Sequence, residues 1–127
     1  MVTQPRDLHE ALSEAYNAGD LEALLSLYEP RAAFVVEPGH VTRSEADLRT
    51  ALQHLLALRG RLTIDPQTFI GSDDLVLVLG TFTLSGHRRS GTQFERTSRF
   101  VDVLRRRPNG RWLLAVDNPY GGEQIVR

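Results

Sequence analysis

Residues 75–84 read LVLVLGTFTL, a stretch that is apolar in both of its alternating registers. Successive side chains of a β-strand point to opposite faces of the sheet. One face then holds Val76, Val78, Phe82 and Leu84, and the other holds Leu75, Leu77 and Leu79. A sheet that is apolar on both faces needs a cover on each side. We therefore expect helices on one face and a second copy of the chain, as a homodimer, on the convex face.

Three further stretches show the period of two that is typical of strands. They span residues 62–70, 94–106 and 112–118, and each is bounded by Gly, Pro, Asn, Asp or Ser. The connection Pro108-Asn109-Gly110 is too short for a parallel crossover, which needs a dozen or more residues. The second half of the chain is therefore predicted to form an antiparallel meander.

The first half has the spacing of amphipathic helices instead. Residues 8–16 form one apolar stripe that ends at Gly19, and residues 20–28 form a second helix, capped by Asp20 and stopped by Pro30. A short strand over 32–37 closes at Pro38-Gly39. A third helix runs from a Ser44 cap to Gly60. The order predicts an α+β fold with three helices packed on one curved sheet.

Composition limits both the architecture and the chemistry. The chain has 127 residues, which predicts one domain over residues 1–127, and its net charge is −1. All 15 basic residues are arginine and there is no cysteine, so Schiff-base and thiolate chemistry are excluded. The charge balance and the two arginine runs, 88–89 and 105–107, give no reason to expect nucleic acid or membrane binding. We expect a cytoplasmic protein that uses no cofactor.

Several local strings, taken in order, resemble the nuclear transport factor 2-like superfamily, in its SnoaL-like and ketosteroid isomerase-like branch. They are Asn17-Ala18-Gly19-Asp20-Leu21, Leu27-Tyr28, Pro38-Gly39, Ala51-Leu52, Gly110-Arg111-Trp112 and Asp117-Asn118-Pro119-Tyr120-Gly121. The resemblance covers nearly the whole chain. It implies a cone-shaped, cystatin-like fold with a mainly antiparallel sheet, a hydrophobic pocket and, commonly, a homodimer. Isomerases, dehydratases, cyclases and binding modules share this fold, so it implies no single reaction.

The resemblance also implies three candidate catalytic residues. The carboxylate base of ketosteroid isomerase-like members falls near Glu37, with Val36 as the other register, and the late acidic position falls on Asp102. The family tyrosine falls on Leu12, and Tyr16 lies one turn further along the same helical face. Each has a structural alternative. Glu37 could be a solvated turn residue, Asp102 could pair with Arg96 or Arg99, and the hydroxyl of Tyr16 could be satisfied in the core.

Seven more residues are candidates for lining the pocket: Leu12, Phe34, His54, Leu55, Phe100, Trp112 and Asn118. For His54 the alternative is a surface position, for Trp112 the core, and for Asn118 a turn before Pro119. The sequence shows no spacing of histidines and carboxylates that is typical of a metal site. The sequence thus favours an isomerase or cyclase acting on a small hydrophobic carbonyl compound. The alternative is a non-catalytic ligand-binding or dimeric assembly module.

Overall fold

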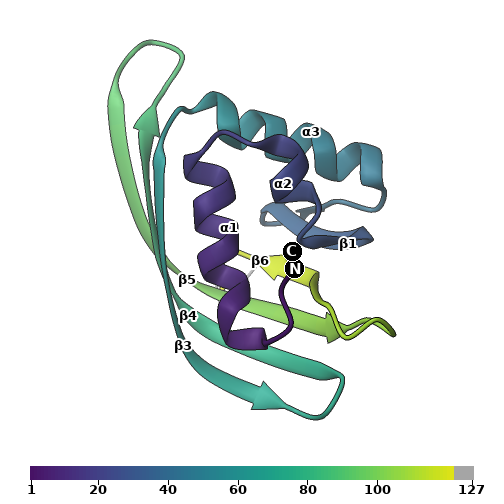
Figure 1. Ribbon diagram of the computed structural model, residues 1–127. Helices are drawn as coiled ribbons and strands as arrows, with labels where there is room; N and C mark the ends of the chain where they lie inside the picture. Colours follow the sequence, from purple (N-terminus) through teal and green to yellow (C-terminus); the bar gives the residue numbers. More distant parts are fainter. Residues whose placement is uncertain (122–127) are drawn as a thin grey trace.

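The computed structural model, described here over residues 1–121, has three helices on one side of a six-stranded sheet (Figure 1). The helical elements are a 3₁₀ turn (η1, Pro5–Asp7), α1 (Leu8–Asn17), α2 (Leu21–Leu25) and α3 (Glu45–Ala57). The strands are β1 (Tyr28–Glu37), β2 (His40–Val41), β3 (Arg61–Gly71), β4 (Leu75–His87), β5 (Gln93–Arg106) and β6 (Trp112–Asn118). This arrangement confirms the predicted α+β fold.

The sheet has the strand order β2-β1-β6-β5-β4-β3. Strands β3 to β6 form the predicted antiparallel meander, β1 and β2 are also antiparallel, and β1 pairs in parallel with β6. The long strands β3, β4 and β5 curve around α1, which packs against β3, while α3 packs against β1 (Figure 1). The curvature leaves a concave face beneath the helices.

Both predicted helix caps are present. The Asp20 carboxylate accepts a hydrogen bond from the Ala23 N–H at 3.0 Å, and the Ser44 hydroxyl accepts one from the Asp47 N–H at 3.1 Å. Each bond satisfies an amide that has no partner within its helix. The caps therefore fix where α2 and α3 begin.

Two predicted boundaries are wrong in the same region. The second helix ends at Leu25 rather than at residue 28, and the first strand begins at Tyr28 rather than at residue 32. The cause is non-local, because Tyr28 pairs with Leu114 of β6 and the Leu114 N–H donates to the Leu27 carbonyl at 2.8 Å. Pairing with β6 thus converts the end of an apparent helix into strand. The two-residue strand β2 was also not predicted.

The core lies between the helices and the concave face. Leu8, Leu48 and Leu52 from the helices, and Val78, Leu104 and Leu114 from the strands, are almost completely buried. Burial stabilises each such side chain by about 1.5–3 kcal/mol relative to an exposed position. Among residues 1–121, no helix has the length and apolar character needed to cross a membrane.

Candidate active site

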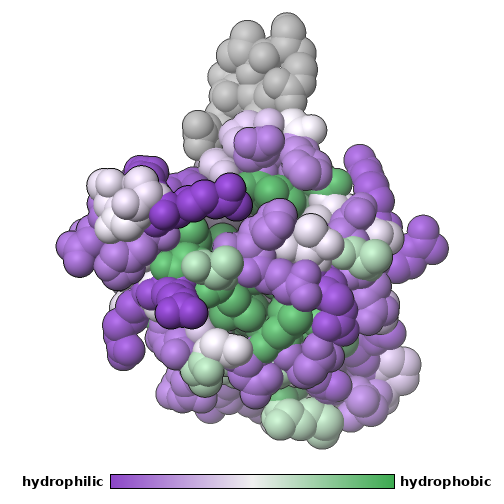
Figure 2. Space-filling model, turned by 90° about the horizontal axis from the view of Figure 1, so that it is seen from above, coloured by the Kyte–Doolittle hydropathy of each residue, from purple (hydrophilic) through white to green (hydrophobic). Residues whose placement is uncertain are grey.

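A cavity of about 120 Å³ lies between the helices and the concave face of the sheet. Most of its wall is apolar and includes Leu12, Leu55, Leu62, Ile64, Phe82 and Leu84. Viewed from above, apolar side chains gather within a border of hydrophilic ones (Figure 2). Four polar residues line the buried end of the cavity: His9, Tyr28, Asp102 and Asp117.

The structure brings six of the ten predicted site residues to this cavity: Leu12, Tyr16, Phe34, Leu55, Phe100 and Asp102. The other four, Glu37, His54, Trp112 and Asn118, do not line it. The six inward residues come from α1, α3, β1 and β5, so elements from both halves of the chain build the site.

The expected inward position of Glu37 is wrong. Glu37 is exposed at the end of β1, opposite His40 in the β1–β2 hairpin, and Val36 lines the cavity instead. Because side chains alternate along a strand, the inward position of Val36 turns Glu37 away. The register left open by the sequence is therefore resolved in favour of Val36.

The remaining three residues take the positions that their structural alternatives described. His54 is exposed on α3, and Trp112 is buried in the core outside the cavity. Asn118 pairs with Val101 across the sheet, and its side-chain amide donates to the Gly121 carbonyl at 3.0 Å. Asn118 still contributes to the site through its backbone N–H, which donates to Asp102 Oδ1 at 3.0 Å.

Asp102 forms its closest side-chain contact with a residue that the sequence analysis did not select. His9 Nε2 of α1 lies 2.7 Å from Asp102 Oδ2 of β5, and both side chains are almost fully buried. The His9 ring also stacks on Phe100, with 4.8 Å between ring centroids. Asp102 therefore pairs with neither Arg96 nor Arg99, the two partners considered from the sequence. One signal was available, because His9 shares a helical face with Leu12 and Tyr16.

Burial shifts the pKa values of these two groups in opposite directions, because it disfavours the charged form of each. It lowers the pKa of His9 to about 4 and raises the pKa of Asp102 to about 7. The imidazole is thus neutral near pH 7, while the carboxyl of Asp102 titrates there. When Asp102 is ionised, the neutral imidazole can donate its Nε2 proton to Oδ2, and this bond fixes the histidine tautomer.

A second buried carboxyl lies beside the first. Asp117 of β6 is the cross-strand partner of Asp102, and it accepts a hydrogen bond from the Tyr28 hydroxyl at 2.5 Å. Burial, followed by the negative charge of Asp102, raises the pKa of Asp117 well above its usual range. Burial likewise raises the pKa of Tyr28. Asp117 and Tyr28 therefore stay protonated while Asp102 ionises, which separates the roles of the two carboxyls.

Two tyrosines along the cavity wall use their hydroxyls to hold the walls together. The Tyr16 hydroxyl donates to the Leu55 carbonyl at 2.7 Å, joining α1 to α3. The Tyr120 hydroxyl donates to the Val36 carbonyl at 2.9 Å. Tyr16 thus presents its ring to the cavity, while its hydroxyl proton is already engaged by a backbone carbonyl. Burial raises the pKa of Tyr16, so this hydroxyl remains protonated near neutral pH.

The described residues 1–121 contain no group of three or more side chains placed to hold a metal ion. The arginine run at the end of β5 makes ion pairs at the surface. Arg105 and Arg107 each lie 2.9 Å from the Glu29 carboxylate, and Arg106 lies 2.7 Å from that of Asp74. Each of these arginines is thus paired with a neighbouring acid, and none of them lines the cavity.

Comparison with known proteins identifies related sequences and folds. The model of the SnoaL-like domain family matches residues 9–115. No curated protein matches the chain. A ketosteroid isomerase-like protein from Erwinia carotovora has a similar structure, with 16% identity, a TM-score of 0.77 and coverage of 88% of each chain.

Two further solved structures have the same fold. A nuclear transport factor 2-like superfamily protein from Salmonella enterica is 15% identical, with a TM-score of 0.78 and coverage of 94% of this chain and 89% of that one. A Streptomyces avermitilis protein assigned as a dehydratase of the NTF2-like family is 20% identical, with a TM-score of 0.70 and coverage of 87% and 88%. At these identities the likeness shows the shared fold.

Proposed function

Because this chain belongs to the SnoaL-like domain family, we propose that its cavity binds a small, largely apolar carbonyl compound and that Asp102 moves a proton on that compound. The cavity of about 120 Å³ approaches the ~150 Å³ apolar cavity known to admit benzene. A molecule with one ring would therefore fill this space, and any larger substituent would extend toward the partly exposed end.

The observation that supports catalysis is the Asp102 carboxyl at the buried end of this cavity, held by His9 and by the Asn118 N–H. A general base works best when its pKa lies near the working pH. The pKa of Asp102, raised to about 7 by burial, meets that condition. Proton abstraction by a carboxylate requires no cofactor.

The proposed reaction is an isomerisation. Ionised Asp102 accepts a proton from a carbon adjacent to the carbonyl, and the electron pair of the C–H bond moves to form an enolate. In a substrate with a carbon–carbon double bond next to that carbon, the enolate is conjugated, and protonated Asp102 returns the proton to the far end of the double bond, which shifts toward the carbonyl, so atoms and charge balance. Protonated Asp117 keeps a second negative charge out of the site, which favours formation of the enolate. In a substrate with a second carbonyl, attack by the enolate carbon would instead close a ring, as in a cyclase.

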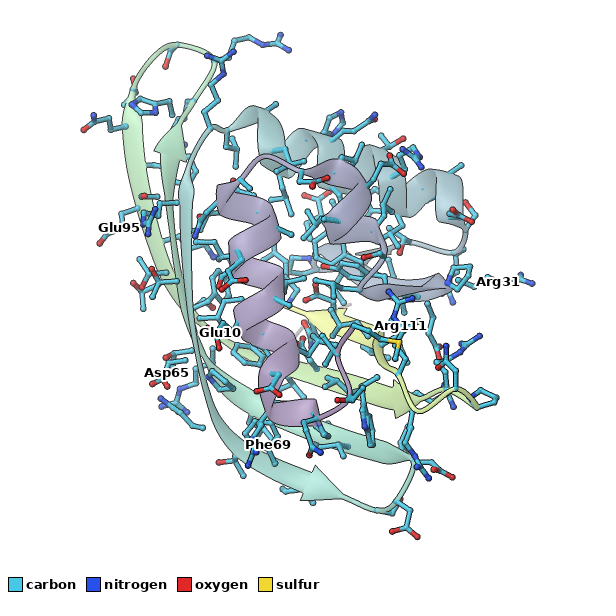
Figure 3. All side chains as sticks on the ribbon, viewed as in Figure 1. Glu10, Arg31, Asp65, Phe69, Glu95 and Arg111 are labelled. Carbon is cyan, nitrogen blue, oxygen red and sulfur yellow. The ribbon has the colours of Figure 1, made fainter. Side chains whose placement is uncertain are left out.

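Deuterium exchange tests this proposal directly. Cyclohexanone in D₂O would be incubated with the protein, and loss of its α-proton signals would be followed by NMR, with binding measured in parallel by saturation transfer. We expect exchange to accelerate as pH rises through about 7 and to fall at least about tenfold in Asp102→Asn. Asp65→Asn is the matched control, since Asp65 points away from the helices on the outer face of the sheet (Figure 3).

The outcomes separate the two hypotheses drawn from the sequence. Binding of the ketone without exchange would indicate a ligand-binding module rather than an enzyme. Equal exchange rates with wild type and Asp102→Asn would show that a group other than Asp102 abstracts the proton. If the ketone does not bind at all, the cavity is not the ligand site and the proposal fails.

We also propose that a second copy of the chain covers the outer face of the sheet. Leu77 and Leu79 of β4 lie opposite Val103 and Val101 of β5, and all four point away from the helices and are partly exposed. Leu75 continues this row and is 44% exposed. Aliphatic side chains adjacent on two strands form a continuous patch, and such patches commonly mark subunit interfaces.

A further inference from the structure

We propose that the ligand of the cavity carries a carboxylate and that Arg96 binds this group at the partly exposed end of the cavity. The inference rests on the proposed function and names the class of substrate, a small carboxylic acid with one apolar ring. It follows from the position of Arg96, from its lack of an acidic partner among the described residues, and from its separation from Asp102.

Arg96 is a cation that faces an otherwise largely apolar cavity. Its neighbour Glu95 points away from the helices (Figure 3), and alternation along β5 places Arg96 on the inner face, where it lines the cavity and is half-buried. Within residues 1–121, no Asp or Glu oxygen lies within 4.0 Å of its guanidinium, whereas Arg105 and Arg107 share Glu29. His9, the other basic residue of the cavity, is held neutral by burial.

The guanidinium of Arg96 is held by neighbouring rings. Its central carbon lies 4.3 Å from the centroid of Tyr120 and 5.8 Å from that of Phe82, and Nη2 donates to the Pro119 carbonyl at 3.4 Å. Contact with ring faces orients the guanidinium plane without using its N–H groups. A guanidinium has five N–H donors, so enough remain for a bidentate contact with a carboxylate.

The separation between Arg96 and Asp102 suits a small molecule. The guanidinium reaches Pro119, two residues beyond Asp117, and Asp117 is the cross-strand partner of Asp102. β6 ends at Asn118, so Pro119 lies immediately beyond the end of the strand that carries Asp117. A carboxylate bound by Arg96 would therefore leave one ring to extend toward Asp102. The positive charge of Arg96 would also offset the repulsion between the ligand's carboxylate and an ionised Asp102.

A pair of probes of nearly equal shape tests the inference. Benzoate and benzamide both carry one ring, but only benzoate is negatively charged at neutral pH. Their dissociation constants would be measured by ligand-observed NMR with wild type, Arg96→Gln, Arg96→Lys and Arg99→Gln. Arg99 is exposed on the opposite face of the same strand, so its variant makes the same change of charge away from the cavity.

We expect wild type to bind benzoate at least about tenfold more tightly than benzamide. Arg96→Gln should abolish this preference, so that the two probes bind equally, while Arg99→Gln should keep the preference. Arg96→Lys should retain part of it, because the charge remains but the bidentate geometry is lost. Added salt should weaken benzoate binding to wild type and leave benzamide binding unaffected, a readout that requires no variant to fold.

Equal binding of the two probes by wild type would overturn the inference and leave the proposed function standing. A benzoate preference that survives in Arg96→Gln would do the same, because another group would then bind the anion. If neither probe binds while cyclohexanone does, the carboxylate inference fails alone. If none of the three molecules binds, the proposed function fails with it.

Discussion

His9 Nε2 and Asp102 Oδ2 lie 2.7 Å apart at the buried end of the cavity, although 93 positions separate them in the sequence. The first residue comes from the first turn of α1 and the second from the middle of β5. Burying both groups opposes their charged forms, so each has a shifted pKa. Such shifts make the stability of the fold depend on pH, which can be measured.

The first prediction concerns Asp102 and pH. Its pKa is raised from 3.8 to about 7 by folding, so between these values the folded chain binds the additional proton. Asp102 therefore lowers the free energy of unfolding as pH rises across this window, by up to about 1.4 kcal/mol per pH unit. We expect the stability of Asp102→Asn, relative to wild type, to increase with pH from about 4 to 7. Urea denaturation at a series of pH values measures this slope.

His9 acts in the opposite direction within part of the same window. Its pKa falls from 6.5 to about 4 on folding, so the unfolded chain binds the additional proton and stability rises with pH between these values. The difference between wild type and Asp102→Asn reports the contribution of Asp102 together with its coupling to His9, which lies 2.7 Å away. Asp65→Asn, which makes the same substitution on the outer face of the sheet, serves as the control (Figure 3). A flat difference for Asp102→Asn would mean that folding leaves the Asp102 pKa unshifted.

The sequence predicted the local parts of this fold and missed the non-local ones. The caps at Asp20 and Ser44 and the change from helical to strand periodicity after Gly60 depend on neighbours in the chain, and they were predicted correctly. The start of β1 depends on β6, with which Tyr28 pairs, so local periodicity extended α2 too far.

The same distinction applies to the site. The position of Asp102 on an apolar strand face could be read from alternation, and the structure places it in the cavity. The contacts of His9, Tyr28 and Asp117 could not be predicted in this way, because they form only where α1, β1 and β6 come together in the fold. Glu37 had the right residue type, but the hairpin it shares with His40 turns it outward.

The second prediction removes the hydroxyl that holds Asp117. Tyr28→Phe keeps the buried ring but leaves the Asp117 carboxyl without its 2.5 Å partner. A buried polar group that loses its hydrogen bond costs about 1–3 kcal/mol. We expect a loss of that size in the free energy of unfolding, measured in urea. Tyr120→Phe is the comparison, because its hydroxyl is less buried and should cost less. Equal losses in the two variants would contradict the prediction, because burial of Asp117 would then add nothing to the cost of removing the hydroxyl.

The third prediction tests the close packing of β4 against Phe100. A Cβ atom on Gly80 would lie 2.3 Å from the Asp65 carbonyl oxygen and 2.8 Å from the Phe100 ring. Because these atoms cannot give way without moving the sheet, Gly80→Ala should destabilise the fold by about 3 kcal/mol. Gly91→Ala is the control, since its Cβ meets nothing within 4 Å and only its positive φ opposes alanine. Thermal unfolding of both variants measures the two effects. A less stable Gly91→Ala would contradict the prediction.

The fourth prediction concerns the outer face of the sheet. If a second copy covers Leu77 and Val103, sedimentation should give about twice the 14.3 kDa of one chain at micromolar concentration. Leu77→Arg places a charge in the proposed interface and should yield a folded monomer, because burying an unpaired charge is costly. Thr83→Arg introduces the same charge on the same face of β4, beyond the aliphatic row, and should remain dimeric. A monomeric wild type would leave the aliphatic row as solvent-exposed surface and exclude the homodimer.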